Sequence, residues 1–357
     1  MSVESSAATT RSPSPSDPSE PLLVVRGLGK RFAVERTFFG RPTSWLSAVD
    51  AVDLDVRQGE TLALVGESGC GKSTLARLIL GLIPASEGTI TFEGLDVRAA
   101  KGAELRRFRR RAQLVFQDPY GSLDPRMKVD AIVAEGMARE QTTKEQRRAR
   151  VLELLDLVEL APDAVDRFPH EFSGGQRQRI SIARALAVAP TFLIADEPVS
   201  ALDVSVQSRM LNLLSDLQER LNLTYLFISH DMSVVRHVAD RVAVMYLGKI
   251  VEQATAAEIF ENPLHPYTQA LLSSVPTLTR RRFTKRIVLE GDVPSAIDPP
   301  QACRFASRCF RVIDHCRVEV PPLEGIAGNS AHRVACFNYE PIGADADEGR
   351  GSSGDDG

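Results

Sequence analysis

The sequence lacks any long apolar run. Its best candidate, residues 75–83, is short and contains Arg77, whereas a helix that crosses a bilayer needs about 20 apolar residues. The N-terminus also lacks a charged start followed by an apolar stretch, so no signal peptide is expected. We therefore expect a cytosolic chain, and other polypeptides would have to supply any membrane-spanning helices.

A strong charge of one sign is also missing. The net charge is only -4 over 357 residues, and 43% hydrophobic with 25% charged residues is the balance of a soluble globular protein. This argues against a general nucleic-acid binder, and the basic run at 106–111 is interpreted as a solvated helix face. The length suits one large domain with an appendage or two ordinary domains.

Cysteine is scarce and unevenly placed. Cys70 stands alone, and the other four lie in the last sixth of the chain: Cys303, Cys309, Cys316 and Cys336. In a reducing compartment such a cluster indicates metal binding before disulfides. Four thiols match the ligand count of a [4Fe–4S] cluster or a Cys₄ zinc site, although the short cysteine pairs usual for zinc are absent. Four reduced, buried thiols are the third possibility.

Strand-like and helix-like patterns alternate between two biased tails. Residues 1–20 and 341–357 are expected to be disordered. Strands are expected at 22–25, 62–65, 89–92, 113–116, 192–195, 225–228 and 242–246, with helices from the Gly-rich turn to about 82, at 147–160 and at 176–188. This alternation predicts an α/β fold with a largely parallel sheet between helices. The sheet pattern ends near Pro263, where we place a domain boundary between 22–262 and 263–340.

The run from 66 to 74, GESGCGKST, matches the phosphate-binding loop pattern between a strand and a helix. Glycines let backbone N–H groups close around phosphate oxygens, and the following helix points its positive end at the same anion. Lys72 would reach the β- and γ-phosphates, and the Ser73 hydroxyl would ligate Mg²⁺. The predicted ATP-binding residues here are Gly66, Ser68, Gly69, Cys70, Gly71, Lys72, Ser73 and Thr74. Cys70 is interpreted as a small residue tolerated where only the backbone matters.

Two carboxylates follow the strand at 192–195. Asp196 and Glu197 would lie at the carboxyl edge of the sheet, beside the phosphate-binding loop. Asp196 would hold Mg²⁺, usually through water, and Glu197 would polarise the attacking water.

The pentapeptide from Phe172 to Gln176, FSGGQ, resembles the signature sequence of ABC-type ATPases. Other family elements follow in order: Gln117 resembles the Q-loop glutamine, 200–203 the D-loop and His230 the switch histidine. Phe32 resembles the base-stacking aromatic, although an insertion at 33–47 follows it. The resemblance implies a P-loop ABC ATPase fold, with a parallel-sheet core, an antiparallel subdomain and a helical subdomain.

The resemblance also implies a mechanism. Two such domains face each other head to tail with two ATP molecules between them. Glu197, His230 and Gln117 would be catalytic, and Mg²⁺ would be held by Ser73, Gln117 and Asp196. Each ATP would also contact signature and D-loop residues of the other subunit, namely Ser173, Gly174, Gly175, Gln176 and Asp203.

Three stretches narrow the resemblance to the ATPases of oligopeptide and dipeptide importers. They are QDPYGSLDPR at 117–126, NPLHPYT at 262–268, and the spacing C-x5-C-x6-C-x19-C in the extension at 263–340. Relatives with this spacing can carry a [4Fe–4S] cluster, which favours iron–sulfur over zinc. The insertion at 33–47 resembles that of the second (F-type) ATPase of such transporters. Tyr120, Leu123 and Met127 would form an exposed apolar socket for a membrane subunit.

This family resemblance implies ATP hydrolysis coupled to peptide import at the cytoplasmic face of the inner membrane. The implied partners are two transmembrane permease subunits, a second homologous ATPase in a heterodimer and, indirectly, an extracytoplasmic solute-binding protein. No nucleic-acid partner is expected. A nickel or other small-solute importer of the same family, and a soluble ABC ATPase unrelated to transport, remain as alternatives.

Overall fold

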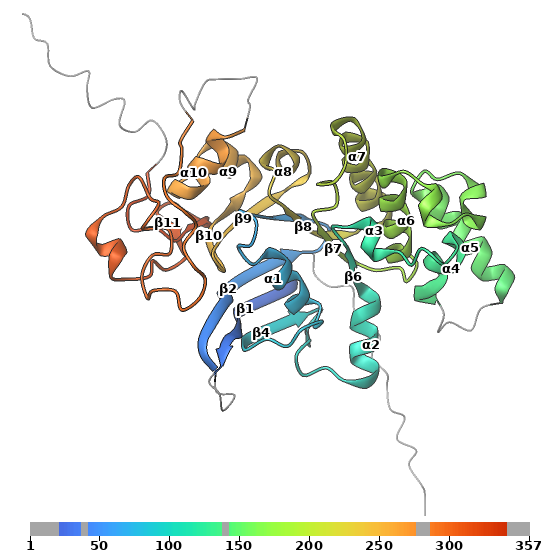
Figure 1. Ribbon diagram of the computed structural model, residues 1–357, viewed down its shortest axis with the longest axis horizontal. Helices are drawn as coiled ribbons and strands as arrows, with labels where there is room; N and C mark the ends of the chain where they lie inside the picture. Colours follow the sequence, from blue (N-terminus) through green and yellow to red (C-terminus); the bar gives the residue numbers. More distant parts are fainter. Residues whose placement is uncertain (1–20, 37–41, 138–142, 276–285, 341–357) are drawn as a thin grey trace, which may run out of the picture.

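The computed structural model describes residues 21–36, 42–137, 143–275 and 286–340. Its centre is an eight-stranded sheet in the order β11-β12-β10-β9-β3-β8-β7-β6 (Figure 1). The five central and edge strands from β9 to β6 run parallel, and β10, β12 and β11 continue the sheet antiparallel. Their bounds are β3 Thr61–Val65, β6 Ala112–Val115, β7 Phe192–Asp196, β8 Thr224–Ser229, β9 Arg241–Tyr246, β10 Lys249–Thr255, β11 Glu324–Ile326 and β12 Asn329–Val334.

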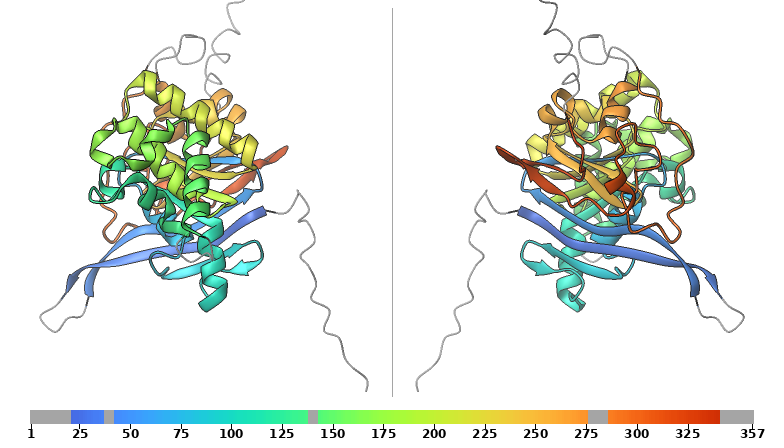
Figure 2. Two further views of the ribbon diagram at one scale, coloured as in Figure 1. Left: turned by 90° about the vertical axis from the view of Figure 1, so that its right-hand side faces the viewer. Right: turned by 90° about the vertical axis from the view of Figure 1, so that its left-hand side faces the viewer.

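A second, antiparallel sheet has the order β2-β1-β4-β5. It comprises β1 Pro21–Arg36, β2 Pro42–Arg57, β4 Glu87–Phe92 and β5 Leu95–Asp96. The hairpin of β1 and β2 projects far beyond the rest of the molecule (Figure 2). The described residues of the predicted insertion, 33–36 and 42–47, continue this hairpin: Ala33 pairs with Trp45, and Phe32, just before the insertion, pairs with Leu46.

Helices complete three regions of the fold. α1 Lys72–Ile79 and α2 Gly102–Arg111 lie near the antiparallel sheet, and a helical group at one end contains α3 Pro119–Ser122, α4 Val129–Ala134, α5 Lys144–Leu157 and α6 Gly174–Leu186 (Figure 1). The remaining helices are α7 Val204–Leu221, α8 Met232–Val238, α9 Ala256–Glu261 and α10 Pro266–Ser273, with short 3₁₀ turns at Glu135–Met137, Pro162–Asp166, Pro169–Glu171 and Asp314–Arg317.

The periodic apolar residues of α5 explain the helical group. Val151, Leu154 and Leu155 are fully buried, as their spacing on one helix face predicts. They join one apolar core with α4, α6 and α7. The predicted α/β class, with a parallel core, an antiparallel sheet and a helical group, is confirmed.

The predicted end of the sheet near Pro263 is wrong. β12, from the extension, pairs with β10 through Glu252 opposite Val334 and Gln253 opposite Arg333. An unpaired β10 would expose a row of backbone hydrogen-bonding groups, and β12 covers that edge. The division into 22–262 and 263–340 stays a prediction about domains, but the sheet is continuous across it. The two predicted tails, 1–20 and 341–357, lie outside the described residues.

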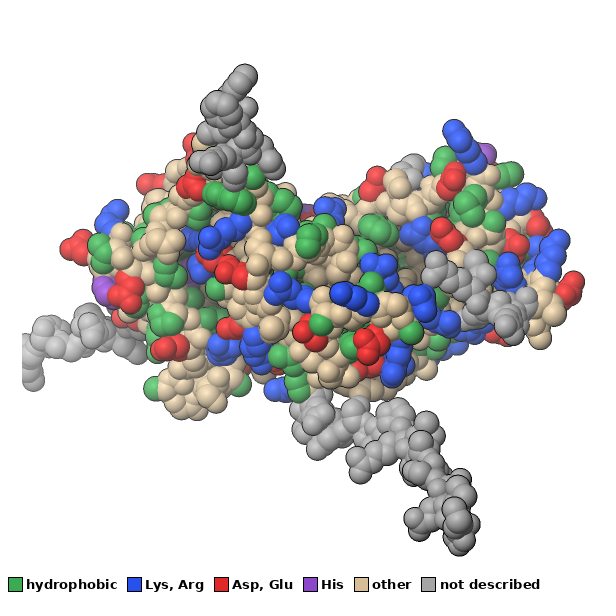
Figure 3. Space-filling view, turned by 90° about the horizontal axis from the view of Figure 1, so that it is seen from below, with side chains coloured by type: hydrophobic (Ala, Val, Ile, Leu, Met, Phe, Trp, Pro, Cys, Tyr) green, Lys and Arg blue, Asp and Glu red, His purple; other side chains and the backbone are tan. Residues whose placement is uncertain are grey.

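The predicted apolar socket is also partly wrong. Leu123 is buried in the core of the helical group, and Met127 is only partly exposed. The side chain of Tyr120 lies outside the described part of the structure. Within the described ranges, none of the helices has the length and apolar composition that crossing a membrane would require. Basic and acidic side chains are interspersed on the face seen from below (Figure 3).

Candidate functional site

The loop at 66–71 needs glycine for two physical reasons. Gly66 and Gly71 have φ of 157° and 112°, in a region that side-chain-bearing residues rarely adopt. A Cβ at Gly66 would lie 2.1 Å from the Met245 carbonyl oxygen, and one at Gly71 would lie 2.2 Å from that of Ala48. The loop therefore fits between β2 and β9 only without these side chains.

Lys72 is the first residue of α1 and is 4% exposed. Its ammonium group donates to the carbonyl oxygens of Gly66, at 2.7 Å, and Glu67, at 3.0 Å. The charge thus lies inside the loop, where a phosphate could replace these carbonyls. Burial raises the pKa of the neighbouring Cys70 thiol, although Lys72 opposes this shift. A protonated, buried thiol is unreactive, in agreement with Cys70 as a small packing residue.

Ser73 and Asp196 come together from α1 and the end of β7. The Ser73 hydroxyl donates to Asp196 Oδ1 at 3.1 Å. Burial raises the pKa of Asp196, the Ser73 hydrogen bond lowers it, and the charge of Glu197 raises it again. A hydroxyl and a carboxylate are the hard oxygen ligands that Mg²⁺ takes alongside nucleotide phosphates, so these residues fit the ion.

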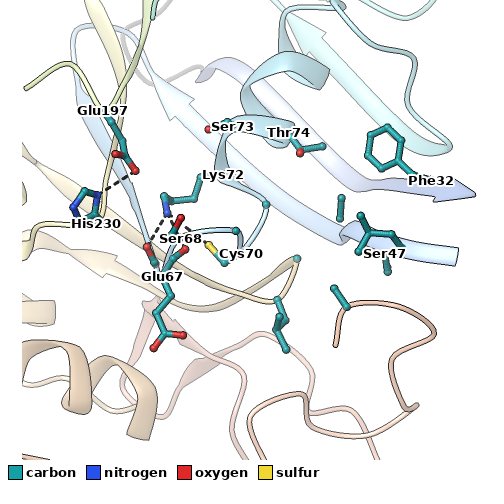
Figure 4. Close-up of a pocket in the computed structure, with 18 of the residues that line it drawn as sticks. Phe32, Ser47, Glu67, Ser68, Cys70, Lys72, Ser73, Thr74, Glu197 and His230 are labelled. Carbon is teal, nitrogen blue, oxygen red and sulfur yellow. Dashed lines mark hydrogen bonds and ion pairs between the residues drawn. The ribbon is translucent and has the colours of Figure 1, made fainter. Parts of the chain in front are cut away.

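Two of the other predicted residues contact the Glu197 carboxylate. The Gln117 amide donates to Oε2 at 2.9 Å, and His230 Nδ1 lies 3.1 Å from Oε1 (Figure 4). The Glu197 backbone has φ of 48°, an uncommon conformation for a residue with a side chain.

These groups line one cleft of about 650 Å³, a size typical of ligand sites. Phe32, which is 37% exposed, lines it from β1, and Lys30 Nζ lies 4.9 Å from the Phe32 ring centroid. The structure brings together these predicted residues: Gly66, Ser68, Gly69, Cys70, Gly71, Lys72, Ser73, Thr74, Phe32, Gln117, Glu197 and His230.

The signature residues do not line this cleft. Ser173 is the N-cap of α6: its hydroxyl accepts from the Gln176 N–H at 3.3 Å, and the Gln176 side chain accepts from the Ser173 N–H at 3.0 Å. A Cβ on Gly175 would lie 2.7 Å from Val206, so the start of α6 lies close against α7. Ser173, Gln176 and Asp203 are exposed, and the intervening Gly174 is partly exposed.

Sequence patterns missed the residues that the extension contributes. Leu271 and Ala296 line the cleft, and the Ser47 N–H donates to the Ala296 carbonyl at 2.9 Å. The hydroxyl of Tyr267 and the guanidinium of Arg308 both reach Glu67. Tyr267 stands in a recognised stretch, but no local pattern points from it, or from Arg308, to the loop.

The four clustered cysteines do not support the predicted metal site. Across the described ranges, no group of three or more His, Cys, Asp or Glu side chains is placed so that it could hold a metal ion. Burial raises the pKa of Cys303, and it raises that of Cys309 to about 11 and of Cys336 to about 12. An iron–sulfur cluster needs several thiolates that converge on one site, and the described residues as placed do not form such a group.

Two family descriptions match the chain: "ABC transporter" over residues 49–200, and "Oligopeptide/dipeptide transporter, C-terminal region" over residues 251–316. Among relatives, the chain is 49% identical over 324 residues to the oligopeptide transport ATP-binding protein AppF of Bacillus subtilis, covering 90% of this chain and 98% of that protein. It is 45% identical over 321 residues to the dipeptide transport ATP-binding protein DppF of Haemophilus influenzae, covering 90% and 97%.

Solved structures show the same architecture. The chain matches cbiO1 from Clostridium perfringens, part of the ABC transporter complex cbiONQ, with a TM-score of 0.58 and 28% identity, covering 68% of this chain and 91% of that one. It matches the dimeric, ADP- and Pi-bound ATP-binding cassette MJ0796 with a TM-score of 0.57 and 28% identity, covering 66% and 98%.

Proposed function

Because this chain belongs to the ABC transporter family and, within it, to the oligopeptide/dipeptide transport ATP-binding proteins, we propose that it hydrolyses ATP to energise a peptide importer. The observation that carries the proposal is a single cleft. It combines a glycine-rich loop, the buried Lys72 and the Gln117–Glu197–His230 group.

ATP would bind with its phosphates in the loop and its base against Phe32. The ammonium of Lys72 would exchange its two carbonyl partners for phosphate oxygens. Mg²⁺ would be held by Ser73 and Asp196, with Gln117 near it, and when bound it neutralises charge on the phosphate oxygens.

Glu197 is the proposed general base. Its carboxylate lies between Gln117 and His230, so both neighbours fix its orientation. A water held by this group would give its proton to Glu197 as its oxygen bonds to the γ-phosphorus, and the bond from that phosphorus to the leaving ADP would break. His230 and Gln117 would hold that water and the phosphate in line, which is the main requirement of phosphoryl transfer.

The exposed signature residues supply a second half-site. A Ser–Gly–Gly turn at a helix start is an anion-binding site, and Ser173 presents it to solvent instead of to its own cleft. We propose that it closes over the ATP of a second, homologous ATPase, whose own signature and D-loop cover the ATP of this chain. ATP-driven closure would then push on two transmembrane permease subunits at the cytoplasmic face of the membrane.

The solute is inferred from the relatives and not from the cleft. Peptides follow from the relatives' names, whereas a nickel or other small-solute importer would need the same ATPase chemistry. Co-purification of the tagged chain from its native membrane tests this step. Two membrane subunits and peptide-stimulated ATPase activity, dependent on the solute-binding protein, are expected; recovery of the chain without membrane subunits would contradict the transport role.

Glu197→Gln tests the catalytic assignment. The amide cannot accept the proton, so turnover should fall at least about 100-fold while MgATP still binds. Steady-state phosphate release and an ATP titration measure the two effects. Lys72→Ala is the control that should lose binding itself. Turnover at the wild-type rate in Glu197→Gln would refute the assignment of the base.

An iron–sulfur cluster in the extension keeps only the family resemblance as support, and no step of the mechanism runs through it. Iron and sulfide analysis of anaerobically purified protein tests it. Stoichiometric iron and sulfide, lost on replacing Cys316 by Ser, would establish the cluster in spite of the arrangement described above. Absence of both would leave four free thiols, of which Cys316 is buried.

A further inference from the structure

Glu67, in the phosphate-binding loop, is held at three places. Its N–H donates to the Tyr267 hydroxyl at 2.8 Å, and its carbonyl accepts from Lys72 at 3.0 Å and from the Cys70 N–H at 3.3 Å. Its carboxylate points away from Lys72, toward the ribbon of the extension (Figure 4). Because Glu67 begins the turn that ends at Cys70, its orientation determines where the following N–H groups point.

Arg308, 241 residues further along the chain, binds that carboxylate. Its Nη1 lies 2.9 Å from Glu67 Oε2 and 3.3 Å from Oε1, and it also reaches the Tyr246 hydroxyl at 3.4 Å. The Arg308 side chain is 9% exposed and that of Glu67 is 28% exposed. Solvent and salt screen a partly buried, charge-assisted contact of this kind less than they screen a surface ion pair.

A rigid aromatic group lies behind the contact. Tyr246, Tyr267 and Phe305 are fully buried, with ring centroids 4.7 to 5.5 Å apart. On the other side, Arg304 donates to the Leu247 carbonyl and pairs with Asp50 of β2. The segment that carries Arg308 is therefore fixed to the sheet at two points. This packing limits how far Arg308 can move relative to Glu67.

We propose that Arg308 is a positioning residue for nucleotide binding: the extension holds the phosphate-binding loop in shape through the Arg308–Glu67 contact. The inference rests on the proposed ATP-binding function. Arg308 does two things at once. It fixes the carboxylate end of Glu67, and it neutralises a negative charge that would otherwise stand beside the nucleotide phosphates.

These two effects predict different outcomes for the two partners. Arg308→Gln loosens the loop and leaves the Glu67 charge unpaired, so affinity for MgATP should fall about tenfold. Glu67→Gln loosens the loop without leaving a charge, so the loss should be about threefold. The double variant should match Glu67→Gln and bind better than Arg308→Gln. Because neither residue contacts Glu197, kcat at saturating MgATP should change less than twofold.

The experiment uses the full chain, titrated with MgATP and with MgADP, and its steady-state ATPase activity. Arg311→Gln is the matched control, since Arg311 lies in the same segment and reaches the Glu340 carbonyl at 2.9 Å. It should bind both nucleotides as the wild type does. Arg308→Lys keeps the charge and should recover part of the affinity. Glu67→Gln, which leaves no charge unpaired, covers the case in which Arg308→Gln fails to fold.

The positioning role would be refuted if Arg308→Gln binds both nucleotides with wild-type affinity while Lys72→Ala loses binding. If Arg308→Gln does not fold, the same result with Glu67→Gln would refute it. Equal losses in Arg308→Gln and Arg311→Gln would also refute it, because they would show general loosening of the extension. Both outcomes leave the ATP-binding function intact. A wild-type chain that binds neither nucleotide would overturn that function and this inference together.

Discussion

The motif-bearing part of the chain, residues 62–230, and the extension, residues 263–340, both line the nucleotide cleft, but with different kinds of residue. The first uses neighbours in sequence: the loop at 66–74 and the pair Asp196–Glu197 act together because a strand, a turn and a helix place them together. The second uses isolated residues: Ala296 lines the cleft, and Arg308 contacts Glu67 of the loop from outside it. The phosphate-binding loop and the acidic pair thus each occupy consecutive residues, whereas the residues of the extension that contact the loop lie far from it along the chain.

The extension is attached through a buried acid. Glu252, on β10, is fully buried, and its carboxylate accepts from the N–H groups of Leu264 and His265 at 2.8 and 3.0 Å. His332 Nε2, from β12, lies 2.8 Å from the same carboxylate. One side chain therefore satisfies groups from two separate segments of the extension, and such a carboxylate is costly to disturb.

The largest effect on stability is expected from Glu252→Gln. A carboxamide offers one accepting oxygen where three donors converge, so the free energy of unfolding should fall by about 3 kcal/mol. Urea unfolding of the full chain measures it. Glu319→Gln makes the same change in an exposed pair, where Glu319 lies 3.1 Å from His315. It should change stability by less than about 0.5 kcal/mol. Equal losses would show that the extension is not anchored at Glu252.

A second, smaller effect should depend on pH. Burial lowers the pKa of His265 to about 4, although the charge of Glu252 opposes the shift. The unfolded chain takes up this proton near its ordinary pKa of 6.5 and the folded chain does not, so stability is complete above about pH 6.5 and falls toward pH 4. The loss from about pH 7.5 to about pH 5 should be about 2 kcal/mol.

His265→Asn isolates that contribution. Asparagine can still accept the Tyr267 N–H that His265 Nδ1 accepts at 3.1 Å, but it does not titrate. Denaturant unfolding at the two pH values should therefore give a variant whose stability declines with acid by about 2 kcal/mol less than that of the wild type. The same decline in both proteins would assign the acid sensitivity to other groups.

The smallest expected effect on stability comes from removing either of two helix caps in the motif-bearing part, of which only one belongs to the proposed half-site. Ser173 and Thr143 cap α6 and α5 with the same geometry: each hydroxyl accepts from the backbone N–H three residues on, at 3.3 and 3.2 Å. Ser173→Ala and Thr143→Ala should each cost about 1 kcal/mol of stability. Only Ser173→Ala should also lower the ATPase rate of the assembled transporter, by about tenfold, because only Ser173 belongs to the proposed half-site. Equal ATPase rates in the two variants would contradict that role.

Prediction from the sequence succeeded where a function occupies consecutive residues. The expected strands before Gly66 and Asp196, and the helix after Lys72, are present, because hydrophobic period and glycine content are local signals. Prediction failed at Pro263, because proline-rich stretches hide the return of β12 to the edge of β10. It also failed at Leu123, whose burial depends on α4, α5 and α6 and not on its proline-rich neighbours.

By itself, the sequence determined the fold class, the phosphate-binding loop and the order of the proposed catalytic residues, because backbone conformation and side-chain spacing over a few residues specify them. Only the tertiary structure decided three matters. Gln117 and His230 meet at Glu197, and Ser173 faces away from its own cleft. The extension contacts the phosphate-binding loop through Arg308. Each is a contact between distant segments, and such contacts depend on how the sheet orders its strands and on which groups remain to be buried together.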